Sequence, residues 1–341
     1  MSPDQKHFLV ENLQHLGYCV GFCGDGTNDC GALKSADIGL SLSEAEASVA
    51  APFTSNNSDL ECVLQVIREG RAALVTSFCC FKYMALYSLI QFTSVSLMYS
   101  LAQNIGDFQF MYIDICLIIP IAVFMGQTGP HPSIHPKRPT ASLVSKKVLT
   151  SLIGQVVLSM IFQIGIFVWV RSQPWYKEGI ADIENQTYLS MENTVVFLSS
   201  CYQYVIVAIV FTVGPPYQAS IWKNVPLISV IFLIISFTTY LTLLPPTIAV
   251  DLLEIVVLPW NGRVVIVAVA IFNFVASWLV ERYVILYLVK FLGLITERIR
   301  IMKIDRNVVD THSNYSLHRL AKIEKWRQSG KKFKIIQDEF K

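Results

Sequence analysis

The chain has 341 residues, of which 53% are hydrophobic and only 15% are charged. Its mean hydropathy is +0.48, whereas about 25% of the residues of a typical soluble domain are charged. This composition excludes an ordinary soluble globular protein and indicates a membrane protein. The formal net charge of +2 gives no reason to expect nucleic acid or another polyanion as a partner.

The N-terminal segment, residues 1–57, has the composition of a soluble domain. Apolar residues at helical spacing predict a short helix from Asp4 to Leu16, ended by Gly17, which can adopt a left-handed conformation. Apolar runs at 18–23 and 38–42 predict two strands, with a helix over 28–36 between them. Strands that alternate with helices typically form a parallel sheet. We therefore expect an α/β fold here.

A stalk helix is predicted over residues 58–81. Ser58 and Glu61 have the spacing of a capping box, which favours a helix start at this point. No Pro interrupts the sequence from there to Phe78. The helix is therefore expected to run from the head towards the membrane.

Residues 82–292 form the apolar part of the chain. A helix needs about 20 residues to cross about 30 Å of hydrocarbon. Six such segments fit this part of the sequence, which predicts a polytopic α-helical membrane domain with both of its ends on one side. The segments are Tyr83–Leu101, Phe108–Gly126, Leu149–Val170, Asn193–Val213, Val225–Leu244 and Val264–Val280.

The charges of the connections predict the orientation, because Lys and Arg in short loops are retained on the cytosolic side. The second connection is basic, with Lys137, Arg138, Lys146 and Lys147. The third is acidic and contains the glycosylation sequon Asn185-Gln186-Thr187. Head and tail are therefore expected to be cytosolic.

The tail, residues 293–341, is basic. From Lys290 onwards the chain has 13 basic and 6 acidic residues. Such a segment can bind the anionic lipids of the cytosolic leaflet. The alternative is ordinary retention of positive charge beside a solvated helix.

The residues that indicate chemistry lie in the turn from Gly24 to Asp29, after a predicted strand and before a predicted helix. Its glycines allow a tight turn, and Asp25 and Asp29 place two carboxylates at the end of the strand. Carboxylate oxygens suit Mg²⁺, and ligands bind at this edge of open α/β sheets.

The complete string at residues 24–33, GDGTNDCGAL, resembles the phosphorylation domain of the P-type ATPases, which has a haloacid-dehalogenase-like fold. The resemblance implies that Asp25 and Asp29 bind the catalytic Mg²⁺. It also implies that Gly24, Gly26 and Asn28 support the phosphate site.

Four further segments are similar to the fifth class of these pumps, in its polyamine-exporting branch of late endosomes and lysosomes. They are the strings DCGALK at 29–34, AEAS at 45–48, PFTS at 52–55 and FKYMALYS at 81–88. The resemblance covers the whole chain and matches the C-terminal portion of such a pump.

The chain also departs from the family pattern. It contains neither the Asp-Lys-Thr-Gly-Thr string, whose Asp is phosphorylated, nor the Thr-Gly-Glu string. No catalytic residue is therefore assigned, and ATP would be bound by regions outside these residues. We expect the chain alone neither to hydrolyse ATP nor to transport.

Asp114, Tyr87 and Gln91 are the candidate substrate-binding residues. Asp114 is an acid in the middle of a predicted span, where charge is costly and usually functional. Tyr87 and Gln91 are four residues apart and so share one face of the preceding span. A carboxylate, an aromatic ring and an amide can bind an ammonium group, such as that of a polyamine. The resemblance also places residues matching these three in the substrate channel.

Other polar residues within the spans are expected to join helices by hydrogen bonds, namely Gln155, Gln163, Gln203 and Asn273. Two other functions stay open. One is that of the sister branch, which extracts misinserted helices. The other is that of an inactive membrane fragment that associates with a full-length pump.

Overall fold

The computed structural model describes residues 1–42, 51–57, 59–140, 142–182, 187–212, 214–285, 287–291 and 293–294. It divides the chain into two units, Met1–Glu281 and Arg282–Lys341. Several predicted features lie outside the described residues: Ser58, the motif at 45–48, sequon residues 185–186 and the basic tail from residue 295.

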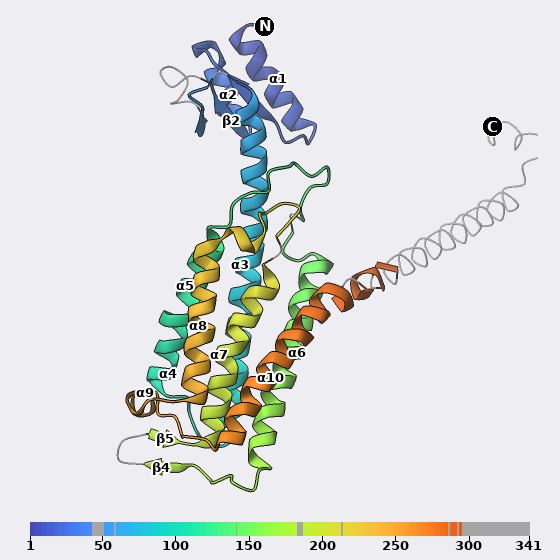
Figure 1. The fold of residues 1–341 in the computed structure, drawn as a ribbon. Helices are drawn as coiled ribbons and strands as arrows, with labels where there is room; N and C mark the ends of the chain where they lie inside the picture. The colour runs from blue at the N-terminus through green and yellow to red at the C-terminus, as the bar shows by residue number, and fades with distance from the viewer. Residues whose placement is uncertain are drawn as a thin grey trace, which may run out of the picture. The chain divides into compact units, whose positions relative to one another are not determined.

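The head contains a three-stranded parallel sheet, as the alternation of strands and helices predicts (Figure 1). The strand order is β1-β2-β3, with Gly21 opposite Ile38 and Leu40 opposite Phe53. The head consists of α1 (Pro3–His15), β1 (Gly21–Gly24), a 3₁₀ turn (Thr27–Asp29), α2 (Cys30–Ser35), β2 (Ile38–Ser41) and β3 (Phe53–Thr54).

Helix α1 has well-defined ends. Ser2 and Gln5 form a capping box at its start, which the sequence analysis did not identify. Gly17, with φ +84°, follows its C-terminus, in the left-handed conformation expected there. These ends determine where the chain leaves α1 to enter β1.

Helix α3 (Glu61–Tyr99) combines the predicted stalk and the first membrane span in one continuous helix of 39 residues. It begins at Glu61 with Leu60 as N-cap, not at Ser58, and the side chain of Asp59 accepts the Glu61 amide at 3.3 Å. A helix rises 1.5 Å per residue, so α3 is about 58 Å long. It therefore connects the sheet directly with the membrane bundle.

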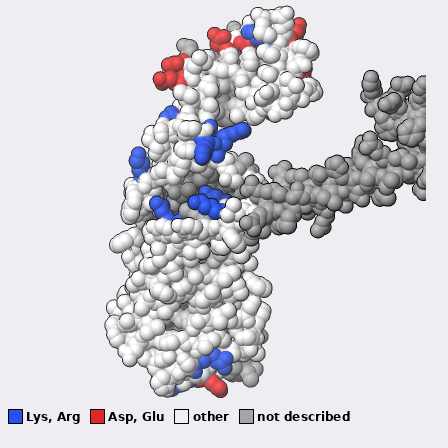
Figure 2. Space-filling model, turned by 90° about the vertical axis from the view of Figure 1, so that its right-hand side faces the viewer, with Lys and Arg blue, Asp and Glu red and all other residues white. Residues whose placement is uncertain are grey.

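Six helices of the described chain are long and apolar enough to cross a membrane, which confirms the predicted number. Their bounds are Glu61–Tyr99, Asp107–Gly126, Lys146–Arg171, Met191–Phe211, Val225–Leu243 and Trp260–Phe291. On the face drawn in Figure 2, charged side chains gather on the head and near the ends of the bundle, and a broad middle zone has none. Such an uncharged zone is what contact with hydrocarbon requires.

The second and sixth of these helices are not regular α-helices. The second consists of α4 (Asp107–Met111), a π-helical segment (Tyr112–Ile118) and α5 (Ile119–Gly126). The sixth contains α10 (Trp260–Leu279), followed by a π-helical turn at Val280–Val284. Hydrophobic periodicity did not predict either π-helical segment.

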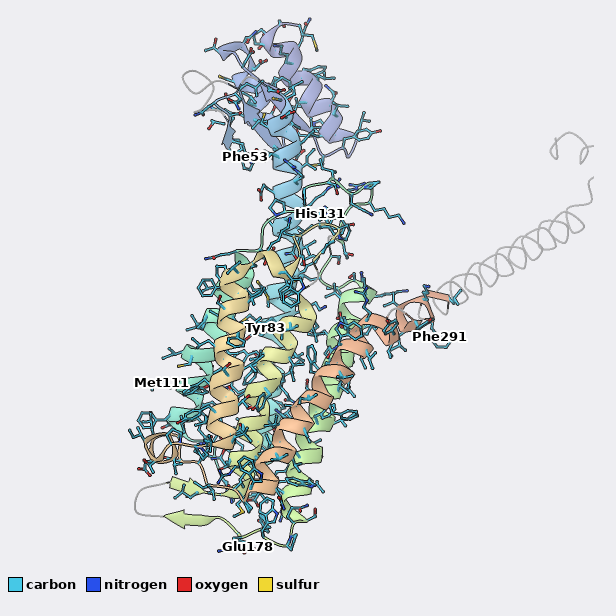
Figure 3. All side chains as sticks on the ribbon, in the orientation of Figure 1. Phe53, Tyr83, Met111, His131, Glu178 and Phe291 are labelled. Carbon is cyan, nitrogen blue, oxygen red and sulfur yellow. The ribbon has the colours of Figure 1, made fainter. Side chains whose placement is uncertain are left out.

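The third and fifth connections contain structure that the sequence analysis did not predict. An antiparallel pair, β4 (Ile180–Asp182) and β5 (Thr187–Leu189), lies between the third and fourth spans. Helix α9 (Thr247–Leu252) lies between the fifth and sixth spans. In Figure 3, Glu178 is at the end of the bundle opposite the head, and His131 is at the end nearer to it.

Helix α7 (Met191–Phe211) is the centre of the bundle. It is buried along almost its whole length, whereas the other spans bury about a third of their residues or less. It packs against α3, α6 (Lys146–Arg171), α8 (Val225–Leu243) and α10. The other spans therefore surround it and face outwards.

Three of the four polar residues expected to join helices do so. Gln155 donates to the Ser277 carbonyl at 3.0 Å, Gln163 to Ser94 Oγ at 2.9 Å, and Gln203 to the Ser159 carbonyl at 3.1 Å. For Asn273 the expectation stays a prediction. Asn273 accepts a hydrogen bond from Ser277 on its own helix.

Acidification tests a link between α1 and the sheet. Asp37 accepts the Val20 amide at 2.8 Å and the Gln14 side chain at 3.2 Å, and these bonds lower the pKa of its carboxyl. Their contribution to stability is therefore complete above the ordinary aspartate pKa of about 3.9, and is lost as the pH falls through the lowered value. We expect the protection factors of the Val20 and Gly21–Gly24 amides against hydrogen exchange to fall there.

The variant Asp37→Asn should show this loss of protection already at pH 7. The matched control is Glu69→Gln, which removes an exposed carboxylate from α3. Equal exchange of the Val20 amide in the two variants would contradict the assigned link.

Candidate functional site

The turn after β1 needs glycine at position 24. A Cβ atom at Gly24 would lie 2.6 Å from Asp29 Oδ2 and 2.8 Å from Asp29 Cβ, which is too short for any side chain. At Gly26 a Cβ atom would meet only the end of the exposed Asn28 side chain, which can move. Gly24 therefore allows Asp29 to fold back over the end of the strand.

The two aspartates of this turn differ in environment. Asp29 is 5% exposed, and its Oδ1 pairs with Lys6 Nζ at 2.7 Å. Asp25, directly after β1, is exposed, as is Asn28. The turn thus has one fixed carboxylate and one accessible carboxylate.

Lys6 was not among the predicted site residues. It lies on α1, 23 residues before Asp29, and no motif or local spacing connects the two. Its ammonium group adds a positive charge beside the aspartates. A cation at this place suits a site for phosphate oxygens as well as it suits Asp29.

The turn offers Mg²⁺ two protein carboxylates and leaves its other ligands to water and phosphate. Among the described residues, no group of three or more His, Cys, Asp or Glu side chains could hold a metal ion. Mg²⁺ is usually bound by one or two carboxylates, with water and substrate phosphates supplying the other oxygens. Asp25 and the Oδ2 atom of Asp29, whose Oδ1 pairs with Lys6, match that pattern.

Cys23 adds no thiolate to this turn. It is the last residue of β1 before Gly24, and burial, followed by Cys62 and Asp25, raises the pKa of its thiol. The thiol is therefore protonated at neutral pH, and only thiolates are good metal ligands.

The second group of predicted residues lies in the bundle. Tyr87 on α3 donates from its hydroxyl to Asp114 Oδ1 at 2.5 Å. This is a charge-assisted bond between two helices, and such bonds are stronger than neutral ones. Tyr87 also has a side-chain hydrogen bond with Gln91, so the structure brings together all three residues predicted to bind substrate.

The backbone around Asp114 is irregular. Asp114 is part of the π-helical segment, and its carbonyl accepts the Ile119 amide. Pro120 follows at the start of α5 and has no N–H, so a carbonyl of the preceding turn loses its helical partner. Single π-helical turns inside helices are frequent at functional sites.

A second aromatic side chain packs against Tyr87 of the Tyr87–Asp114 pair. The rings of Tyr87 and Tyr204 meet edge to face, with centroids 5.6 Å apart. Tyr204 is fully buried on α7. The contact of Tyr204 with Tyr87 could not be predicted, because nothing in the sequence indicates which helices are neighbours.

Gln91 and Ser94 are placed differently. Gln91 lies one turn beyond Tyr87 on α3 and is half-buried. Ser94 is buried and accepts the hydrogen bond from Gln163. The polar face of α3 therefore continues beyond Tyr87, and at Ser94 it is joined to α6 by the hydrogen bond from Gln163.

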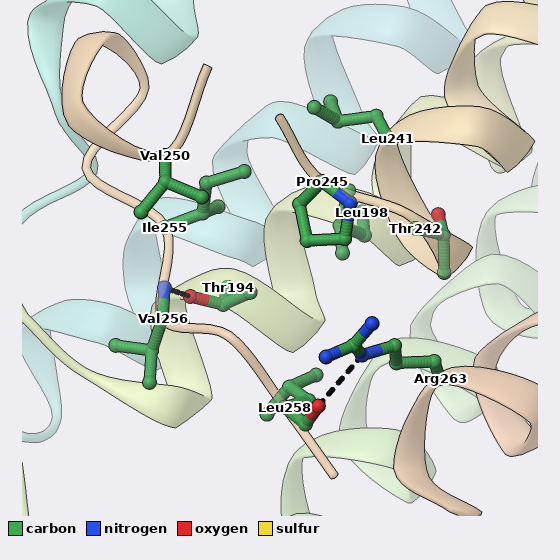
Figure 4. A pocket seen from close by; sticks show the side chains of 10 residues that line it. All are labelled: Thr194, Leu198, Leu241, Thr242, Pro245, Val250, Ile255, Val256, Leu258 and Arg263. Carbon is green, nitrogen blue, oxygen red and sulfur yellow. Dashed lines mark hydrogen bonds between the residues drawn. The ribbon is translucent and has the colours of Figure 1, made fainter. Parts of the chain in front are cut away.

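A small pocket lies at the end of the bundle opposite the head (Figure 4). It is mostly apolar. Its one charged side chain, Arg263, donates to the carbonyls of Leu258 at 2.6 Å and Leu243 at 2.8 Å. Those donors hold the connections around α9 in place.

No protein-family model matches the chain, but individual proteins are similar to it. The vacuolar cation-transporting ATPase YPK9 of Saccharomyces cerevisiae is 55% identical over 66% of the chain and 15% of the relative. The polyamine-transporting ATPase 13A3 of Homo sapiens is 43% identical over 83% of the chain and 25% of the relative. The polyamine-transporting ATPase 13A2 of Homo sapiens is 43% identical over 82% and 24%. The chain thus spans a quarter or less of the length of these relatives.

Removal of the Tyr87 hydroxyl tests the intramembrane pair. Tyr87→Phe takes a donor away from a carboxylate in apolar surroundings, and a hydrogen bond to a charged group contributes about 1.5–3 kcal/mol. We expect the free energy of unfolding of the chain in detergent to fall by about that amount. The measurement is thermal or denaturant unfolding.

Tyr240→Phe is the control for this change, because Tyr240 lies on a span but is 48% exposed. It should leave the stability unchanged. If Tyr87→Phe destabilises Asp114→Asn chains as much as wild-type chains, the two residues do not interact, and the assignment is wrong.

Proposed function

The chain belongs to the 13A family of P-type ATPases, the fifth class of these pumps, and on that basis we propose that it is the C-terminal section of an ATP-driven polyamine transporter. The observation that carries the proposal is the Tyr87–Asp114 pair within a bundle of apolar helices. The names of relatives 13A2 and 13A3 state that they transport polyamines.

In this proposal, Asp114 binds an ammonium group of the substrate. Tyr87 occupies one carboxylate oxygen, and the other accepts a cation. Gln91 supplies an amide along the same path, and the aromatic rings add cation–π attraction. A polyamine carries its charges apart along an apolar chain, and it suits a passage with one acid and several aromatic rings.

The head takes part in phosphoryl transfer. Asp25 and Asp29 hold Mg²⁺, with Gly24, Gly26 and Asn28 shaping the phosphate site around it. When bound, Mg²⁺ neutralises negative charge on the transferred phosphoryl group. The sheet and the turn support a haloacid-dehalogenase-like domain, of which this chain holds the C-terminal part.

The phosphorylated Asp and the residues that bind ATP are supplied by parts of the pump outside these 341 residues. The described chain by itself therefore neither hydrolyses ATP nor transports. Helix α3 transmits changes between the head and Tyr87, because it connects the two without interruption.

The pump spans a late endosomal or lysosomal membrane, with the head and the basic tail in the cytosol and the tail close to anionic lipids. The support is the distribution of charge: basic residues in the second connection and acidic ones in the third. The yeast relative is named as a vacuolar ATPase.

The substrate assignment is tested in a complete pump that contains this section. Asp114→Asn should abolish the ATP turnover stimulated by spermine, because the amide cannot balance the charge of an ammonium group. Asp107→Asn, an exposed acid seven residues earlier on the same span, is the matched control and should retain turnover. Stimulation by spermine that survives Asp114→Asn overturns the proposal.

The length of the native polypeptide can be measured directly. An antibody to the tail should detect a protein several times larger than 38.4 kDa on an immunoblot of the native membranes. A stable species near 38.4 kDa would instead favour an inactive form that associates with a full-length pump. Purified short chain that hydrolyses ATP, with turnover lost in Asp25→Asn, would contradict the proposed inactivity.

A further inference from the structure

An ion pair between a buried lysine and a half-buried glutamate joins the stalk helix to the last membrane helix. Lys82 Nζ on α3 lies 3.2 Å from Glu281 Oε1, and their side chains are 9% and 23% exposed. The two residues are 199 positions apart in the sequence. Lysine is almost never fully buried unless it is paired, so each residue requires the other.

Two further helices contact the pair. From α6, Ser151 Oγ donates to both carboxylate oxygens of Glu281, at 2.7 and 2.9 Å, and Gln155 Nε2 lies 3.4 Å from Oε2. From α7, the ring of Phe211 lies beneath the ammonium of Lys82, 4.0 Å from its centroid. The pair is therefore the meeting point of four membrane helices.

Glu281 reaches this point from a π-helical turn, Val280–Val284, at the end of α10. One extra residue in a helical turn rotates the side chains that follow by about 100°. Such turns are less stable than regular helix and persist where a side chain needs a particular direction. Here the π-helical turn contains Glu281, whose carboxylate contacts Lys82 on α3 and Ser151 on α6.

Stability alone does not account for such a pair. Apolar residues of similar volume are often as stabilising as a buried ion pair, or more so, because removal of two charges from water is costly. A charged pair differs from apolar packing in that it fixes one geometry. We propose that Lys82 and Glu281 are positioning residues that fix the rotation of α3 and so hold Tyr87 against Asp114. This inference rests on the proposed function of the Tyr87–Asp114 pair.

The distance along α3 is short enough for this effect. Tyr87 follows Lys82 by five residues, about 7.5 Å along a continuous helix. Between them, Tyr83 and Leu86 are fully buried. A rotation of α3 at Lys82 therefore moves the Tyr87 hydroxyl relative to Asp114, while Lys82 itself contacts neither the carboxylate nor substrate.

The test measures amide hydrogen exchange of the chain in lipid nanodiscs, without any polyamine. Lys82→Gln and Glu281→Gln should each accelerate exchange in the segment Tyr112–Ile118, which holds Asp114, by roughly tenfold. Lys82→Arg, which keeps the charge, should restore slow exchange. The control for Lys82→Gln is Lys147→Gln, which removes an exposed positive charge. The control for Glu281→Gln is Glu69→Gln, which removes an exposed negative charge.

A double variant separates positioning from stability. Lys82→Met with Glu281→Met removes both charges and should recover the unfolding temperature lost in the single variants. Exchange in Tyr112–Ile118 should nevertheless stay fast in this variant. The inference is overturned if exchange there equals that of the wild type in the single variants, or if it recovers in the double variant.

Spermine binding to the same samples separates this inference from the proposed function. If the variants show the predicted exchange changes but the wild-type chain binds no spermine, the result supports the positioning pair and counts against the substrate assignment. If the wild type binds spermine and the exchange of Tyr112–Ile118 is unaffected by Lys82→Gln, the substrate assignment stands and the positioning role fails.

Discussion

One continuous helix connects every functional part of this chain. Helix α3 begins beside the sheet of the head, passes Lys82 and carries Tyr87 into the bundle. Over its 39 residues the backbone hydrogen bonds repeat without a Pro to interrupt them. In the proposed function this helix moves as a rod, so that a displacement of the head and a change at Asp114 belong to the same motion.

The surrounding hydrocarbon determines how the polar residues of the bundle are paired. Hydrocarbon offers no hydrogen bonds, so each polar side chain within it must find a partner in the protein. Gln155, Gln163 and Gln203 find theirs on neighbouring helices. Two charge-assisted contacts, Tyr87–Asp114 and Lys82–Glu281, include α3. Others join different elements, such as the contact of Tyr176 with Glu192 on α7. The helix proposed to move therefore takes part in two of the contacts that are costly to break.

The sequence predicts the parts of the fold that depend on composition and on local pattern. The six spans follow from runs of apolar residues, and the parallel sheet from strands that alternate with helices. The pairing of Lys82 with Glu281 could not be predicted, because their separation of 199 residues leaves no local signal. The same holds for Lys6 and Asp29, whose contact depends on how α1 packs beside the turn. A π-helical segment of seven residues is too short to leave a recognisable hydrophobic period, so the irregular backbone around Asp114 was also missed.

The bond between Tyr87 and Asp114 limits how a cation can bind. The hydroxyl already occupies Oδ1, so an ammonium group must either share the carboxylate through Oδ2 or displace the tyrosine. Sharing leaves the two helices joined, whereas displacement separates them and frees α3 to turn. If the tyrosine is displaced, binding of substrate would weaken the Tyr87–Asp114 contact, which the Lys82–Glu281 pair is proposed to maintain. Substrate and ion pair would then act in opposition on one helix, which is how a site in the membrane can influence a head that it does not touch.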